Sequence, residues 1–210
     1  MVNVQIPSRE AEKDHPHLLS DRDTDVVRII EEEGLTVFTF DGLRRIMGAH
    51  PETLSRALDR LEEEGMIVRS PGGYSATRKA KDMAGPEPTF TAGRRVPILQ
   101  TFLPYRASLE VIVTALNGRW FDKMRWVGMT ENEEGIVMKW IADNGSILID
   151  ARFSSGQLII EARMKKDSDL PSAIRAAHQL MGRISMMYGS HRPGAKPSAT
   201  QIGYFTTTAM

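Results

Sequence analysis

The sequence contains no cysteine among its 210 residues. This absence excludes disulfide bonds, cysteine-ligated zinc and thiol catalysis, and it is consistent with a reducing compartment. No apolar run reaches the roughly 18 residues that would predict a membrane-spanning helix. Residues 1–17 are polar and lack the apolar stretch of a secretory signal peptide. We therefore expect a cytoplasmic protein with no membrane partner.

The chain also lacks a net charge, because its 27 lysine and arginine residues balance 27 aspartate and glutamate residues. A uniformly basic surface is thereby excluded, so a nucleic-acid-binding protein of this composition must gather its cations on one face. Hydrophobic residues make up 41% of the chain, which is close to the usual share for a folded protein. The length allows two modest domains.

The short motifs typical of catalytic and cofactor-binding sites are missing as well. The sequence has no glycine-rich phosphate loop, no HExxH and no GxSxG. Its five histidines are scattered and have no metal-ligand spacing. We expect no enzyme activity, no cofactor and no metal, and the alternative is a catalytic site assembled in the second domain beside Trp120 and Arg125.

Composition divides the chain into two predicted domains with connecting and terminal segments. The domains, 18–83 and 96–188, are separated by a linker, 84–95, that is rich in glycine and proline. The ends, 1–17 and 189–210, lack periodic apolar residues, and we expect them to be flexible.

The first predicted domain consists of three helices followed by a hairpin. Apolar residues at helical spacing predict helices over 18–33, 40–47 and 50–64. Two short strands, 66–69 and 74–77, flank the turn residues Pro71-Gly72-Gly73. The order helix, turn, helix and hairpin is typical of DNA-binding units in which the last helix enters the major groove.

The third predicted helix has one apolar and one polar face. Its apolar residues recur at helical spacing and should pack on the other helices: Leu54, Ala57, Leu58 and Leu61. Its polar face carries hydroxyl and guanidinium groups, which can bind base edges and phosphates, together with the acidic Glu52 and Asp59. We predict that the DNA-contacting residues are Thr53, Ser55, Arg56 and Arg60 on this helix and Arg69, Arg78 and Lys79 at the hairpin.

The run from Thr39 to Lys79 resembles the winged helix-turn-helix regulators of the MarR and ArsR superfamily. LSRALDRLEEEGMIVR is similar to their recognition helix and first wing strand, and YSATRKA resembles the second wing strand with its basic turn. The resemblance covers roughly residues 18–80. It implies a sequence-specific transcriptional regulator of double-stranded DNA, in which helix 50–64 reads the major groove and the wing contacts the backbone. The alternative is a winged-helix adaptor that binds a protein of the transcription machinery without reading DNA.

The second predicted domain combines an antiparallel sheet with a C-terminal helix, so the expected fold class is α+β. Alternating or continuous apolar residues predict strands over 98–103, 109–114, 136–141, 146–153 and 157–164. Asn144-Gly145 and residues 154–156 are hairpin signals. A helix over 168–188 should pack on the apolar face of this sheet.

Three roles are open for the second domain: forming a homodimer, binding an effector, or contacting the transcription machinery. Its most unusual segment, 117–126, interleaves aromatic and basic residues. Such residues can stack on a ring or hold an anion, so the candidate ligand or partner residues are Arg119, Trp120, Arg125 and Trp126. The simpler interpretation, which we favour, places Trp120, Phe121 and Trp126 over the sheet core and the cations on the surface.

Overall fold

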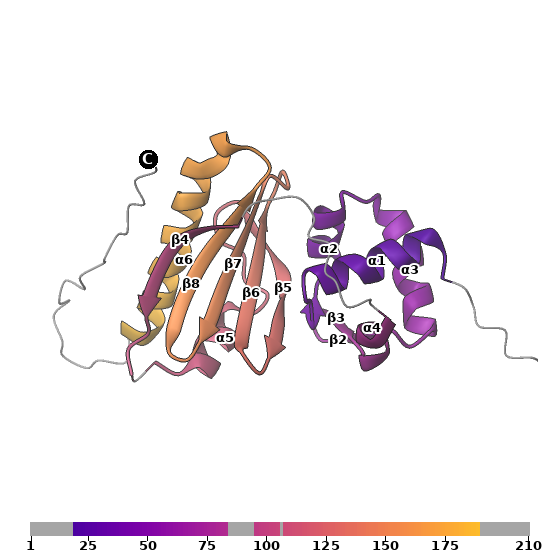
Figure 1. The fold of residues 1–210 in the computed structure, drawn as a ribbon, viewed down its shortest axis with the longest axis horizontal. Helices are drawn as coiled ribbons and strands as arrows, with labels where there is room; N and C mark the ends of the chain where they lie inside the picture. Colours follow the sequence, from indigo (N-terminus) through magenta and orange to yellow (C-terminus); the bar gives the residue numbers. More distant parts are fainter. Residues whose placement is uncertain (1–18, 84–94, 106, 190–210) are drawn as a thin grey trace, which may run out of the picture.

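The structure is a computed structural model that describes residues 19–83, 95–105 and 107–189 (Figure 1). The predicted ends 1–17 and 189–210 and the predicted linker 84–95 therefore lie outside the described residues, with two exceptions. Gly189 ends the last helix, and Arg95 begins a strand.

The N-terminal part contains the three expected helices: α1 (Asp21–Glu32), α2 (Phe40–Met47) and α3 (Pro51–Glu63). Local signals set their ends. The Ser20 hydroxyl accepts a hydrogen bond from the Asp23 amide at the start of α1, and the Thr39 hydroxyl accepts one from the Gly42 amide at the start of α2. Gly48 ends α2 in the left-handed conformation, with φ of 61°.

Three short strands and a fourth helix complete this part: β1 (Val37–Phe38), β2 (Ile67–Ser70), β3 (Gly73–Ala76) and α4 (Arg78–Met83). We call residues 19–83 the helical unit. The three helices and the hairpin follow one another in the order that the sequence predicts, whereas α4 was not predicted.

The C-terminal part confirms the expected antiparallel sheet and C-terminal helix. Its elements are β4 (Arg95–Phe102), α5 (Leu109–Leu116), β5 (Met124–Asn132), β6 (Gly135–Ala142), β7 (Ile147–Ser154), β8 (Gln157–Met164), η1 (Asp167–Asp169) and α6 (Leu170–Gly189). Strands β5 to β8 form a continuous antiparallel meander.

One predicted strand is wrong, and one real strand was not predicted. Residues 109–114 lie in helix α5, because the Ser108 hydroxyl accepts a hydrogen bond from the Val111 amide and caps the helix. Ile112 and Leu116 are buried on the inner side of that helix, one turn apart. Strand β5 overlaps the aromatic and basic segment 117–126 only at its first three residues, and no element was predicted over the rest of the strand.

The two predicted domains share one sheet of eight strands, in the order β2-β3-β1-β5-β6-β7-β8-β4. Strand β1 joins the two parts because it pairs with β3 on one side and with β5 on the other. At the second junction Phe38 lies opposite Gly128. A Cβ atom on Gly128 would lie 2.2 Å from the Val37 carbonyl oxygen, so the close approach of these strands requires glycine.

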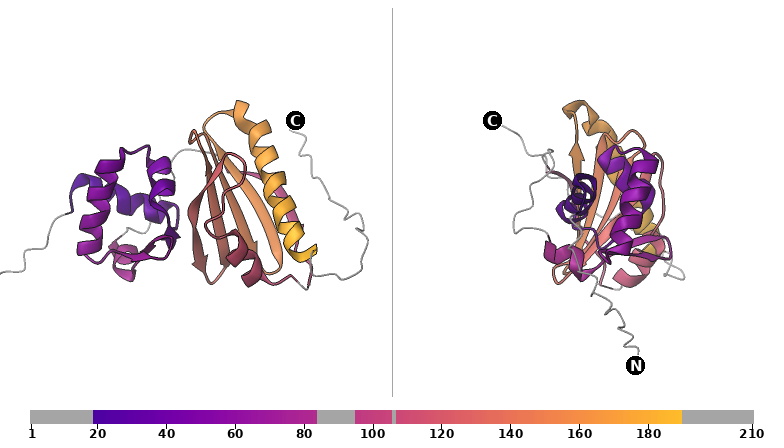
Figure 2. Two further views of the ribbon diagram at one scale, coloured as in Figure 1. Left: turned by 180° about the vertical axis from the view of Figure 1, so that it is seen from behind. Right: turned by 90° about the vertical axis from the view of Figure 1, so that its right-hand side faces the viewer.

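Helices α5 and α6 lie on one side of the sheet portion formed by β4 to β8, and the helical unit lies on the other side (Figures 1 and 2). Helices α5 and α6 pack on one face, where Trp126, Trp140 and Phe153 are buried. The helical unit packs on part of the opposite face, next to the β1–β5 pair, and its core includes three residues from that face: Val127, Ile141 and Leu148.

Four charged residues are buried where α1 meets the sheet: Glu33, Lys139, Asp150 and Arg163. The Lys139 ammonium lies 3.3 Å from the Glu33 carboxylate and 3.1 Å from that of Asp150. Arg163 donates to both oxygens of Glu33, one bond being 2.8 Å. We call these four residues the buried tetrad. Its two positive and two negative charges link the helical unit to β6, β7 and β8.

Candidate nucleic-acid interface

Helix α3 buries its apolar stripe and exposes its predicted reading face. Leu54, Ala57, Leu58 and Leu61 are each at most 1% exposed, so the opposite face must be the outer one. Thr53, Ser55 and Arg56 are exposed on that face. Pro51 occupies the first turn of the helix, as expected. The N-terminal half of α3 thus presents hydroxyl and guanidinium groups to solvent.

Among the residues that the structure describes, Arg56 is held only by a neighbour on the same helix. Its guanidinium lies 2.5 Å from the Glu52 carboxylate, and the side chains are 71% and 64% exposed. Exposed pairs of this kind contribute about 0–1 kcal/mol. Arg56 can therefore exchange Glu52 for another partner at little cost.

Arg60 is anchored far more firmly. It donates two hydrogen bonds, 3.0 and 2.7 Å long, to the carboxylate of Asp23 on α1. Asp23 is 2% exposed and also accepts a hydrogen bond from the Ser20 amide. Burial acts to raise the pKa of Asp23, but the hydrogen bonds from Arg60 and Ser20 outweigh it and the pKa is lowered. Arg60 therefore joins α3 to α1, and its position next to the predicted reading face is fixed.

The predicted cations at the hairpin, except Arg78, also bind oxygen atoms of neighbouring residues. Arg69 donates to Glu62 at 2.7 Å and to Asp59 at 2.8 Å. The Lys79 ammonium donates to the Glu64 carbonyl oxygen at 2.6 Å. For the exposed Arg78 the structure gives no ion pair within the described residues.

The hairpin itself is short. Ser70 pairs with Gly73, so the turn consists of Pro71 and Gly72 alone. A Cβ atom on Gly73 would lie 2.1 Å from the Phe38 carbonyl oxygen. The end of the hairpin therefore lies beside the start of α2, and the hairpin has only four residue pairs, which limits its reach toward a ligand.

The aromatic and basic segment is divided between core and surface. Trp126 and Phe121 are buried and make edge contacts with Trp140, at centroid distances of 5.1 and 5.6 Å. This confirms the core interpretation for these two residues. Trp120 differs, because it is 55% exposed and the Arg125 guanidinium lies 4.4 Å from the centre of its ring.

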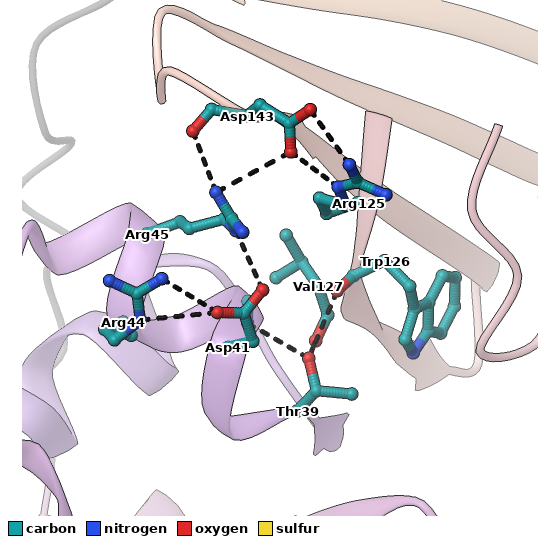
Figure 3. Close-up of polar contacts among 9 residues, drawn as sticks. Thr39, Asp41, Arg44, Arg45, Arg125, Trp126, Val127 and Asp143 are labelled. Carbon is teal, nitrogen blue, oxygen red and sulfur yellow. Dashed lines mark hydrogen bonds and ion pairs between the residues drawn. The ribbon is translucent and has the colours of Figure 1, made fainter. Parts of the chain in front are cut away.

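Arg125 also takes part in a polar cluster that joins the sheet to α2 (Figure 3). It donates two hydrogen bonds, 2.5 and 3.0 Å long, to the Asp143 carboxylate, while Arg45 donates to the Asp143 carbonyl oxygen at 2.8 Å. Asp41 binds both Arg45 and Arg44, at 2.8 and 2.9 Å. The hydrogen bonds from Arg125 lower the pKa of Asp143, since they favour the charged carboxylate.

Thr39 completes the junction on the other side of α2. Its hydroxyl lies 3.1 and 3.3 Å from the carbonyl oxygens of Trp126 and Val127, and its amide donates to the Val127 carbonyl at 2.8 Å. The start of α2 is thereby fixed to the start of β5 (Figure 3).

Sequence reasoning did not single out Asp41, Arg44, Arg45 or Asp143. A signal for the first three was present, because their spacing of three and four residues places them together on a helix. The partnership with Asp143 has no local signal, since that residue follows 98 positions after Arg45.

Within residues 19–83, 95–105 and 107–189, no group of three or more acidic or histidine side chains is arranged to hold a metal ion. None of the helices in these ranges is both long and apolar enough to cross a membrane. Comparison of the chain with models of protein families finds no match, and comparison with curated proteins finds none either.

Proposed function

We propose that this protein is a sequence-specific, DNA-binding transcriptional regulator. The helical unit acts as a winged helix-turn-helix module, α3 enters the major groove, and the hairpin β2–β3 is its wing. One observation carries the proposal: the N-terminal half of α3 is exposed and presents Thr53, Ser55 and Arg56 on one polar face, while the apolar face is sealed in the core. Three observations agree with this assignment: the resemblance of the sequence to winged helix-turn-helix regulators, the order of the elements, and the exposed polar face of α3.

On the basis of their contacts, we propose different roles for the cations. Arg56 is free to pair with a guanine, because its bond to Glu52 is exposed and weak. Arg60 keeps Asp23 as its partner, so it positions α3 and leaves its remaining N–H groups for a phosphate. Thr53 and Ser55 contact phosphates or a thymine methyl group.

Substitution of Arg56 tests the proposal. Duplexes bound by the wild-type protein are selected from a random library, and the affinity of the Arg56→Ala variant for the selected duplex is compared with that of wild type. Loss of a bidentate contact to guanine costs about 1–3 kcal/mol and relaxes the choice of base at one position. Arg28→Ala is the matched control, because Arg28 is an exposed arginine on α1 that pairs with Asp25 at 2.5 Å. Equal losses in both variants, or no selected sequence at all, would contradict the proposal.

A second candidate function is favoured by the charge balance of the same surface. Arg56, Arg69 and Lys79 each have an acidic neighbour, so α3 and the hairpin carry little excess positive charge. A surface of this kind suits a winged-helix adaptor that docks on a protein of the transcription machinery. If the protein is such an adaptor, we expect that the selection from a random library enriches no duplex and that Arg56→Ala leaves partner binding intact.

Two further properties belong to the proposal. We propose a homodimer, because two-fold assemblies are the commonest among soluble oligomers. Its two copies of α3 would bind the two halves of a palindromic site. Light scattering would then give twice the chain mass of 23.5 kDa. We also propose a cytoplasmic location. A regulator must act where the chromosomal DNA lies, and in a cell without a nucleus that compartment is the cytoplasm.

A further inference from the structure

A group of cations lies at the end of the sheet where β5 begins and β8 ends, and two of them belong to the last turn of α2. We call it the junction patch: its cations are Arg44, Arg45, Arg119, Lys123, Arg125 and Lys165, and its carboxylates are Asp41, Asp122 and Asp143. Its net charge is +3, and continuing through Lys166, Asp167 and Asp169 leaves +2. The exposed cations and carboxylates of α3 and the hairpin, by contrast, nearly cancel.

Hydrogen bonds and short contacts connect four of the patch cations: Arg45, Lys123, Arg125 and Lys165. Arg45 and Arg125 bind opposite sides of Asp143 (Figure 3), and the Asp143 amide donates to the Lys123 carbonyl at 2.9 Å. The Lys165 ammonium lies 3.7 Å from the position that a Cβ atom would take on Gly145, in the turn after Asp143.

Three of the patch cations have no acidic partner. Within the part of the chain that the structure describes, no ion pair involves Arg119, Lys123 or Lys165, and all three are exposed. Of the predicted DNA-contacting cations, only Arg78, the first residue of α4, has no ion pair within the described residues. Cations without a bound carboxylate are the ones that can neutralise phosphates and release their counterions.

The turn between α2 and α3 connects the patch to the helix that carries the predicted reading face. Thr39, which caps α2, is bonded to Val127 near the start of β5, and Gly73 at the hairpin turn lies against Phe38. Arg44 and Arg45 are in the last turn of α2, which the three residues 48–50 connect to the first turn of α3. The C-terminal end of α2, which carries Arg44 and Arg45, is therefore adjacent to the N-terminal half of α3, whereas the hairpin turn lies by the N-terminal end of α2.

From these contacts we infer that the junction patch is a phosphate-binding surface, which holds the backbone of the same duplex that α3 reads. The inference rests on the proposed function and extends it: the C-terminal part of the chain contributes directly to DNA binding. The major groove is about 12 Å wide, so the phosphates flanking α3 lie within reach of side chains next to α2. The short hairpin contacts less backbone than a longer wing would, and the junction patch supplies the cations that it lacks.

The test is a salt titration of the full chain with two duplexes, the selected site and a 30-base-pair random sequence. The Lys123→Gln/Lys165→Gln variant should reduce the slope of log affinity against log salt by about 2, since each lost phosphate contact removes about 0.9. At 0.1 M salt this corresponds to roughly 60-fold weaker binding of both duplexes. The control Arg175→Gln/Arg183→Gln removes the same charge from exposed positions on α6 and should leave the slope unchanged.

The outcomes separate this inference from the proposed function. If wild type binds DNA and the patch variant matches it, the inference is overturned while the proposed function stands. If wild type binds neither duplex at low salt, both fall. Unchanged DNA affinity with weakened binding of polyglutamate would instead identify the patch as a surface for an acidic protein, and would also overturn the inference.

Discussion

The substitution Glu33→Gln tests whether the buried tetrad holds the helical unit on the sheet. Glu33 is the only member of the tetrad from the helical unit, and it accepts hydrogen bonds from Arg163 while lying 3.3 Å from Lys139. Glutamine has almost the same shape but no charge, so Lys139 and Arg163 would share Asp150 as their single buried carboxylate. Breaking a buried ion pair on one side costs about 3–5 kcal/mol. With a urea dependence of about 2–3 kcal/mol per molar, the unfolding midpoint should fall by about 1–2 M.

A double variant distinguishes charge imbalance from simple loss of contacts. Glu33→Gln with Lys139→Met removes one charge of each sign, so the remaining Asp150 and Arg163 are balanced. We expect this variant to recover part of the lost free energy of unfolding, because well-packed apolar replacements of buried ions are often neutral. Glu52→Gln is the surface control and should cost no more than about 1 kcal/mol.

The pH dependence of unfolding provides a second measure of the same residue. Burial acts to raise the pKa of Glu33, but Arg163 and Lys139 outweigh it, and the pKa lies below its ordinary value of 4.5. The stabilisation is therefore complete above pH 4.5 and is lost as the pH falls through the lowered pKa of the folded state. Glu33→Gln should lose this part of the acid dependence. A variant as stable as the Glu52→Gln control, with an unchanged acid profile, would refute a stabilising role for the tetrad.

Two further substitutions test the contacts between elements. Gly128→Ala should destabilise the protein by about 1–3 kcal/mol, because the new methyl group meets the backbone of β1. The control is Gly182→Ala on α6, where nothing lies within 4 Å; it should be neutral or stabilising by up to about 1 kcal/mol. Thermal unfolding of both variants measures the difference. Asp23→Asn should lower the free energy of unfolding by about 1–3 kcal/mol, because it leaves Arg60 without its buried carboxylate. It should also weaken DNA binding by more than the loss of stability explains. A variant with the unfolding midpoint and DNA affinity of wild type would show that Arg60 does not need this anchor.

The helical unit could be predicted from sequence because short-range signals determine its elements. Ser20 and Thr39 cap the helices that follow them, Gly48 takes a left-handed conformation, and Pro51 opens α3. Each signal acts within about four residues of the element it defines. The exposed face of α3 follows equally directly from the helical spacing of its leucines.

The C-terminal part was predicted less well where tertiary contacts determine the structure. The β-branched residues of α5 resemble a strand, and only the cap at Ser108 and the burial of Ile112 and Leu116 mark a helix. Strand β5 is interrupted by a register shift between Trp126 and Gly128. It depends on pairing with β1, which precedes it by about 90 residues along the chain.

Partnerships between distant residues had no signal at all. Glu33 and Arg163 are 130 positions apart, and neither residue is unusual in its local sequence. The ion-pair partners of the predicted cations likewise had no local signal. The sequence places Arg60 on the outer face of α3, but only the fold shows that Arg60 pairs with Asp23. Spacing along a helix predicts exposure, whereas ion pairing depends on which elements meet.

Protection of guanine N7 atoms in the selected duplex from dimethyl sulfate tests the central claim most directly, since N7 lies in the major groove. We expect wild type to protect at least one guanine, and Arg56→Ala to lose protection at that position while Arg28→Ala retains it. A bound duplex in which no guanine is protected, or in which all three proteins give the same pattern, would contradict major-groove reading by α3.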